Sequence, residues 1–592
     1  MAVVPSRFKS KNTNSRLFNN HFTYLSQDVF LKPLFLSKPF TMRNSLAKPL
    51  FLFLAMVSIS ASKAQDNQAV LNPYETPKLM VGIVVDQMRY DYITRFWDGY
   101  SEDGFKRLLR EGFNFKNNHY NYAPTSTGPG HASVYTGTTP ATHGIIGNNW
   151  YDKELGASVY CAADNRYASI GTDSSAGQMS PKQLLTTTIT DQLKLHTQSR
   201  SKVIAIALKD RGAVLPAGHT ADAAYWFHGK NEGKWISSTY YMNALPSWVS
   251  QFNTEVPKQY KKPWNLLKSK SEYTRSGPDN SPYEGTFKGQ DTAVFPYDLE
   301  ALWAANGSYD ILKGTAYGNS LTTDFAIAAL KGEALGKGSD TDFLAISYSS
   351  TDYVGHQFGV NSREIEDTYY RLDQDLARLL KALDAQVGVG NYSLFLTADH
   401  AAVHVPSFLS DLKIPAAYFD AAAFRDSLMA YVEDQYGSKD LIENISNYQL
   451  FLNKSLLAQL EIDAHTIQKD LAQFILQNTA VERTYTASQM WEEEYTSGIP
   501  YILQKGYHHK RSGDVLFVLK PAVISYSKTG STHGSPQIYD THTPLLFFGK
   551  GFKNGSSFSR SEIPDIAPTV AAMLGIAFPN GTTGKPLTEV LK

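Results

Sequence analysis

Six side chains that could bind a divalent metal ion stand at the ends of apolar runs or in a short polar loop: Asp86, Asp352, His356, Asp399, His400 and His533. Carboxylate and imidazole ligands together suit hard-to-borderline divalent ions such as zinc. The chain has a single cysteine, Cys161, which excludes a thiolate zinc cluster, an Fe–S centre and an internal disulfide framework. Taken alone, each aspartate reads more simply as a helix cap and each histidine as a core or surface residue. Their recurrence at three predicted strand ends favours a metal site.

The spacing of these residues adds geometric detail. Asp352 and His356 are four residues apart, which places both on one face if a helical turn begins there. Asp399 and His400 are adjacent, so they can share a site only at an irregular strand end, which is where they occur.

A hydroxyl-rich segment, residues 123–133 (APTSTGPGHAS), is the second candidate for chemistry. Hydroxyls followed by Gly and Pro at a helix start suit either a nucleophile or a simple N-cap, and backbone N–H groups there can receive a phosphate oxygen. A hydroxyl is a weak nucleophile at neutral pH unless a base or a metal ion activates it, and the metal cluster could supply that activation.

Four continuous apolar runs predict buried parallel strands at 79–85, 202–208, 343–348 and 393–397, with weaker candidates at 515–519 and 545–549. Between the third and fourth strands, apolar residues from Ile365 to Leu383 form one stripe of a 3.6-residue period and predict a helix. This alternation indicates an α/β domain around a mostly parallel sheet. Because ligands bind at the carboxyl ends of parallel strands, the polar residues that follow the runs should converge there.

The 592 residues are 42% hydrophobic, and Lys+Arg and Asp+Glu both total 56. Nothing in that balance favours nucleic acid as a partner. A short basic start, an apolar core over 49–60 and small residues at 61–64 predict a signal peptide at 42–64, with 1–41 a spurious extension. We therefore expect an exported protein, periplasmic or secreted, without a membrane anchor. The catalytic part would be 65–592, with insertions at about 213–310 and 405–512.

The chain resembles the alkaline phosphatase superfamily through its type I phosphodiesterase/nucleotide pyrophosphatase-like branch, and within it the monomeric periplasmic alkaline phosphatases of the PafA type. The motifs that carry the resemblance span nearly the whole mature chain: VVDQMRYDY at 84–92, PTSTGPGHASVYTG at 124–137, GIIGNNWYD at 144–152, ALKDRGAVLPAG at 207–218, SSTDYVGHQFG at 349–359, LTADHAA at 396–402, THGSPQIYDTHTPLLFFG at 532–549 and IAPTVAAMLGI at 566–576. The resemblance implies a three-layer α/β/α fold with a mostly parallel central sheet and cap insertions.

The resemblance also implies roles for particular residues. Thr127 would be the nucleophile, phosphorylated and then hydrolysed, and would also contact metal. One Zn²⁺ would be held by Asp352, His356 and His533, and a second by Asp86, Asp399 and His400. Phosphoryl oxygens would be bound by Asn148, Lys209 and Arg211. Two cations suit the dianion of a phosphate monoester better than a diester.

Three assignments have neighbouring competitors: His542 for His533, Thr125 and Ser126 for Thr127, and Asn149 for Asn148. The function expected is an exported, zinc-dependent alkaline phosphatase that hydrolyses many small phosphate monoesters through a phosphothreonine, as a monomer. The alternatives are a phosphodiesterase or nucleotide pyrophosphatase on the same di-zinc scaffold, and a non-catalytic phosphate-binding protein. A sulfatase is disfavoured because the motif C/S-x-P-x-R is missing.

Overall fold

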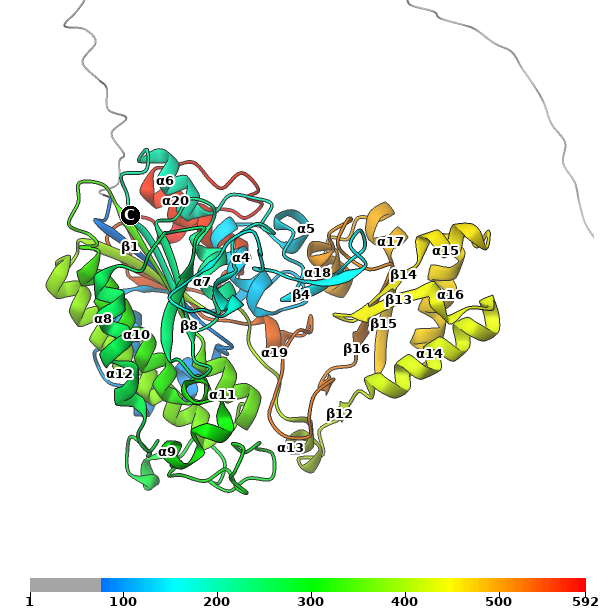
Figure 1. The fold of residues 1–592 in the computed structure, drawn as a ribbon, viewed down its shortest axis with the longest axis horizontal. Helices are drawn as coiled ribbons and strands as arrows, with labels where there is room; N and C mark the ends of the chain where they lie inside the picture. The colour runs from blue at the N-terminus through cyan, green and yellow to red at the C-terminus, as the bar shows by residue number, and fades with distance from the viewer. Residues whose placement is uncertain (1–75) are drawn as a thin grey trace, which may run out of the picture. The chain divides into compact units, whose positions relative to one another are not determined.

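The fold is organised around a ten-stranded sheet, seen here in a computed structural model that describes residues 76–592 (Figure 1). The strand order is β19-β2-β18-β11-β1-β10-β7-β8-β9-β6. Five central strands run parallel: β11 (Tyr392–Thr397), β1 (Leu79–Val85), β10 (Asp342–Tyr348), β7 (Val203–Ala207) and β8 (Ala223–His228). The four strong strand predictions are confirmed, with ends that differ by no more than one residue. Their runs are apolar throughout because both faces of these strands are buried.

The outer strands complete the sheet on both sides. β18 (Leu545–Gly549) pairs antiparallel with β11, followed by β2 (Phe113–Phe115) and β19 (Gly555–Ser557). On the other side, β9 (Lys234–Ser238) and β6 (Ser169–Ile170) follow β8. Because β8 and β9 lie within 213–310, that stretch is not an insertion over its full length. Its aromatic residues Tyr225, Trp226, Phe227 and Trp235 lie on these two strands and are buried.

Helices cover both faces of the sheet. Alternate residues of β1 point to opposite sides, with Val81 and Ile83 in one hydrophobic core and Met80 and Val84 in the other. The first core is covered by α10 (Ala316–Gly332), α11 (Ser350–Phe358) and α12 (Arg363–Gln386). The second is covered by α4 (Thr127–Thr136), α6 (Ile189–His196), α7 (Asp210–Ala217) and α20 (Ile566–Leu574). The chain therefore has the expected α/β/α layers.

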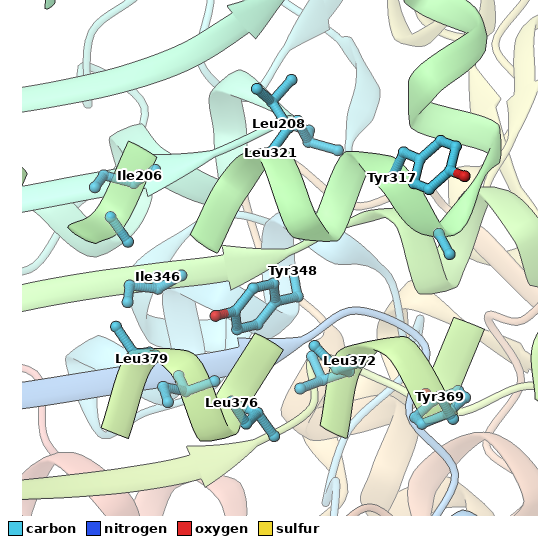
Figure 2. Packing of buried hydrophobic residues seen from close by; sticks show 14 of the residues in the cluster. Ile206, Leu208, Tyr317, Leu321, Ile346, Tyr348, Tyr369, Leu372, Leu376 and Leu379 are labelled. Atoms are coloured by element: carbon cyan, nitrogen blue, oxygen red, sulfur yellow. The ribbon is translucent and has the colours of Figure 1, made fainter. Parts of the chain in front are cut away.

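Figure 2 shows the packing of the first core between the sheet and its helices. Ile206 of β7 and Ile346 of β10 lie on the face of the sheet that is covered by α10, which carries Leu321, and α12, which carries Leu376. The apolar stripe that predicted α12 is buried from Ile365 to Leu383, which confirms that helix.

A smaller sheet of order β13-β14-β16-β15 has its own hydrophobic core. Its strands are β13 (Ile442–Ser446), β14 (Gln449–Leu452), β16 (Val515–Leu519) and β15 (Val481–Thr486), and it packs with α14 (Ala421–Tyr436) and α16 (Ala464–Leu476). The predicted strand at 515–519 therefore exists but belongs to this sheet and not to the central one. Two further helices, α8 (Ser247–Glu255) and α18 (Gly498–Gly506), lie within the stretches expected to be insertions.

The predicted signal peptide at 42–64 and the extension at 1–41 lie outside the described residues. From residue 76 onward, no helix combines the length and apolar character needed to cross a bilayer.

Candidate active site

The six candidate metal ligands lie together at the carboxyl edge of the central strands. Asp86 follows β1, Asp352 and His356 lie on α11 directly after β10, and Asp399 and His400 follow β11, while His533 comes from the loop after β17 (Val523–Ile524). Because α11 begins at Ser350, the i,i+4 pair of Asp352 and His356 shares one helix face, with the His356 Nε2 atom 3.1 Å from Asp352 Oδ1.

Two groups of ligand atoms within this cluster are compact enough for a metal ion: Asp352, His356 and His533, and Asp86, Asp352 and His400. Asp352 thus lies in both groups. The resemblance assigned Asp399 to the second group. In the structure it lies beside that group but is not part of it, with its Oδ2 atom 3.6 Å from His400 Nε2.

The chemistry of the cluster fits a divalent cation. The buried atoms Asp86 Oδ1, Asp399 Oδ2 and His400 Nε2 have no hydrogen-bond partner within residues 76–592. Leaving such atoms buried and unpaired costs free energy unless a cation or donor meets them. Burial lowers the pKa of His400 to about 3, and burial with neighbouring histidines lowers the pKa of His533 well below its ordinary value. Both imidazoles are therefore neutral, the form that binds metals.

The Lys209 ammonium occupies the centre of this anionic cluster. Its Nζ atom lies 2.6 Å from Asp86 Oδ2 and 2.5 Å from Asp352 Oδ2, and its side chain is 2% exposed. Burial alone would lower the pKa of Lys209, but Asp352 and Asp86 outweigh burial and raise it. The lysine therefore stays charged and neutralises carboxylates that a metal ion would otherwise neutralise.

Thr127 begins α4 and points its hydroxyl at two cations. Its Oγ1 atom lies 3.3 Å from Lys209 Nζ and 3.5 Å from Arg211 Nη2, and the residue is 1% exposed. By contrast, the Thr125 hydroxyl donates to the Ser535 carbonyl, away from those cations. Of these two threonine hydroxyls, that of Thr127 is the one that faces the cations, while the buried Ser126 hydroxyl has no hydrogen-bond partner within residues 76–592.

Asn148 is held in one amide orientation. Its Oδ1 atom accepts the backbone N–H of Gly128 at 2.7 Å, and its backbone carbonyl accepts the N–H of Cys161 at 3.0 Å. Because Oδ1 already accepts this hydrogen bond, the Nδ2 group of Asn148 is the part of the amide that can donate to a ligand. Asn149, in contrast, starts β4 (Asn149–Asp152) and is exposed.

Arg211 is oriented by residues from outside its own helix as well as by its neighbour. Its Nη1 atom donates to the Tyr160 hydroxyl at 3.2 Å, and its backbone N–H donates to Asp210 Oδ1 at 2.5 Å. Tyr160 ends β5 (Ala157–Tyr160), the second strand of a hairpin with β4, and its hydroxyl also donates to Asp210.

The two candidate histidines lie in different surroundings. His533 Nε2 is 3.7 Å from Asp352 Oδ1, and its ring stacks on His400 with centroids 3.5 Å apart. His542 Nε2 instead contacts the Lys116 carbonyl, and its ring stacks on His119. His533 is therefore the one that lies within the cluster.

Three residues near the cluster did not stand out in the sequence: Gln87, His131 and Tyr160. His131 lies one turn after Thr127, with Nδ1 2.9 Å from the Thr127 carbonyl and 3.4 Å from Asp399 Oδ2. The four-residue spacing of Thr127 and His131 could have indicated that both lie on one face of a helix. Gln87 and Tyr160 carry no charge, and their contacts join residues far apart in the chain, so the sequence offered no comparable signal for them.

Comparison with known proteins agrees with this arrangement. Residues 80–544 match the family of type I phosphodiesterase/nucleotide pyrophosphatase. A Myroides odoratus protein named calcium-transporting ATPase is 47% identical over 530 residues, 88% of this chain and 95% of that protein. Alkaline phosphatase PafA of Elizabethkingia meningoseptica is 43% identical over 525 residues, 88% of this chain and 95% of that protein.

A crystal structure of wild-type alkaline phosphatase PafA superposes with a TM-score of 0.85 at 43% identity, and the match covers 88% of this chain and 99% of that one. A second solved structure is a PafA variant in which one threonine, one asparagine, one lysine and one arginine are substituted. These are the residue types, in the same chain order, of Thr127, Asn148, Lys209 and Arg211.

Proposed function

Because this chain belongs to the type I phosphodiesterase/nucleotide pyrophosphatase family, we propose that it is an alkaline phosphatase that hydrolyses phosphate monoesters at the cluster around Thr127. The observation that carries the proposal is a threonine hydroxyl that faces a buried lysine and a partly buried arginine, beside unpaired carboxylate and imidazole atoms. The alkaline phosphatase relative matches over most of both chains, which supports the same reaction here.

The reaction begins with attack by Thr127 Oγ1 on phosphorus. The Oγ1–P bond forms while the ester P–O bond breaks; the hydroxyl proton of Thr127 passes to solvent, and the leaving oxygen takes up a proton from solvent to depart as the alcohol. Water then attacks the phosphothreonine, which releases inorganic phosphate and restores the hydroxyl. Burial of Thr127 at a helix start fixes the direction of attack and keeps bulk water from competing.

Binding of the phosphoryl group falls to three side chains. Arg211, held by Tyr160, offers its remaining N–H groups, and Asn148 offers Nδ2 because Oδ1 is occupied by Gly128. Lys209 lies within reach of the same space as Thr127. Two cations match the two negative charges of a monoester, whereas a diester carries one.

Two divalent ions, which we assign as zinc from the ligand types, would be held by Asp352, His356 and His533 and by Asp86, Asp399 and His400. Bound there, they would lower the pKa of the hydroxyl and stabilise the negative charge on the leaving oxygen. With the carboxylates neutralised in that way, Lys209 would no longer be needed as their counter-ion and could turn to the substrate.

The name of the Myroides odoratus relative adds a substrate to test. The terminal phosphoryl group of ATP is also a dianion that leaves by P–O cleavage, so it presents the same charges to Lys209 and Arg211 as a monoester. ATP therefore belongs beside simple esters in the assay.

The deciding experiment uses the purified chain stripped of metal and then supplied with zinc. An aryl phosphate monoester, its methyl diester and ATP are compared by kcat/KM. Zinc-dependent preference for the monoester by several powers of ten supports the phosphatase. Preference for the diester moves the chain to phosphodiesterase chemistry, and absence of zinc-dependent turnover on all three contradicts an enzyme at this site. Export would be tested by N-terminal sequencing of the protein recovered outside the cytoplasm, which should begin near residue 65.

A further inference from the structure

Gln87 connects the two candidate metal groups. Its backbone N–H donates to Asp399 Oδ1 at 3.1 Å, and its side-chain Nε2 donates to Asp352 Oδ1 at 2.7 Å. It follows Asp86 directly, so a single buried residue touches or adjoins a carboxylate from each of three strand ends. No other described residue is seen to donate to both Asp352 and Asp399 from one position.

The backbone at Gln87 is adapted to this arrangement. Its φ of +64° is a left-handed conformation that residues with a Cβ disfavour. The turn directs the N–H toward β11 and the side chain toward α11, so the conformation is what lets both contacts form. Strain of this kind persists only where surrounding contacts impose it, and it is concentrated at functional sites.

The amide of Gln87 also packs closely against α11. A Cβ at Gly355, on the helix that carries Asp352 and His356, would collide with Gln87 Oε1. Glycine at that position therefore lets α11 approach the amide, with Oε1 against Gly355 and Nε2 toward Asp352. The left-handed Gln87 and the glycine in α11 are two separate features that serve the same contact.

We infer that Gln87 is a positioning residue that fixes the Asp352 and Asp399 carboxylates, because it holds one oxygen of each in place beside the candidate metal groups. Within residues 76–592, the second oxygen of Asp399, Oδ2, has no hydrogen-bond partner, and the Asp352 Oδ1 atom that accepts from Gln87 also lies 3.1 Å from His356 Nε2. Residues that orient metal ligands through hydrogen bonds change metal affinity by about 10- to 100-fold when substituted. The inference rests on the proposed function for the presence of the metal ions.

The test separates the side chain of Gln87 from its strained backbone. Gln87→Gly relieves the positive φ and keeps the N–H to Asp399 but removes the amide, whereas Gln87→Glu keeps the shape but replaces the donor with an oxygen facing Asp352. Gln198→Gly is the matched control, because Gln198 is exposed, has φ +51° and lies away from the cluster.

Bound zinc per chain is measured by elemental analysis after equilibration at buffered free zinc, together with the unfolding temperature of the metal-free chains. We expect about a 10- to 100-fold loss of zinc affinity in both Gln87 variants, an unfolding temperature of metal-free Gln87→Gly at or above that of the wild type, and unchanged affinity in Gln198→Gly. Zinc affinity within twofold of the wild type in both Gln87 variants would overturn the inference. A wild-type chain that binds no zinc would instead overturn the proposed function.

Discussion

At the scale of single residues, the site depends on where charges lie around one hydroxyl. Thr127 Oγ1 faces Lys209 and Arg211, and the Lys209 side chain is 2% exposed, so water screens its charge little. In such a setting, opposite charges interact far more strongly than in solution. Substitution of Thr127, which carries no charge itself, should therefore change chemistry much more than stability.

Replacing the nucleophile is the most direct test of its role. Thr127→Ala should lower kcat by roughly a thousandfold or more, because the attacking oxygen is lost while the cations remain. Thr127→Ser should keep measurable turnover, since it retains the hydroxyl. Steady-state rates and trapping of radiolabelled phosphate on the chain check this, and a normal rate in Thr127→Ala would refute the assignment.

Arg211 should discriminate between substrates by charge. Arg211→Ala should lower kcat/KM for an aryl monoester by about 100-fold, the usual cost of one lost oxyanion donor, and lower it less for the methyl diester. Parallel kinetics on the two substrates measure the difference. Equal losses on both would mean that Arg211 maintains the structure of α7 and does not read the charge of the substrate.

At the scale of elements, the hairpin of β4 and β5 supports the site from outside the central sheet. The residue before the hairpin is Asn148, and its last residue is Tyr160, so one element reaches both Gly128 of α4 and Arg211 of α7. A change that disturbs the hairpin should therefore affect phosphate binding without touching the metal ligands.

Tyr160→Phe tests that link. Loss of its hydroxyl removes one hydrogen bond to the charged Arg211, which corresponds to roughly a tenfold fall in kcat/KM for monoesters. The effect should largely disappear when Arg211 is already alanine. Tyr151→Phe, on the same hairpin but hydrogen-bonded to Glu443, is the control and should leave kinetics unchanged. Additive losses in the double variant would contradict the positioning role.

The elements also show what could be predicted from the sequence. Strands buried on both faces carry continuous apolar runs, so β1, β7, β10 and β11 and the polar residues after them could be found. β8 and β9 could not, because their aromatic residues surround a segment rich in Gly, Lys and Asn (229–234), and such a composition resembles a loop. The pairing of Lys209 with Asp86 and the contacts of Gln87 depend on residues 123 to 312 positions apart, which no local pattern records.

At the scale of the whole molecule, a second buried acidic cluster should make stability depend on pH. Burial, then Glu364 and Asp279, raise the pKa of Glu284, and burial raises the pKa of Glu364, which accepts a hydrogen bond from the Tyr297 hydroxyl at 2.6 Å. Because both folded pKa values exceed the unfolded ones, their contribution to stability is present at acid pH and lost as pH rises through the raised values.

Glu284→Gln imitates the protonated carboxyl at every pH. Relative to the wild type, this variant should gain thermal stability as pH rises from the ordinary glutamate range into the alkaline range. Unfolding temperatures of both proteins across that range give the difference, and Glu300→Gln, an exposed glutamate, should show none. A pH-independent difference for Glu284→Gln would show that the pair is not protonated in the folded chain.

The site takes its parts from opposite sides of the sheet. Thr127 begins α4, whose buried residues lie in one core, while Asp352 and His356 lie on α11, whose buried residues lie in the other. Neither helix layer alone carries all the residues of the active site. Activity therefore requires both helix layers to be folded against the sheet. During refolding from denaturant, turnover should return only when the slower of the two layers has folded. Proteolytic fragments that keep only one layer should have no activity.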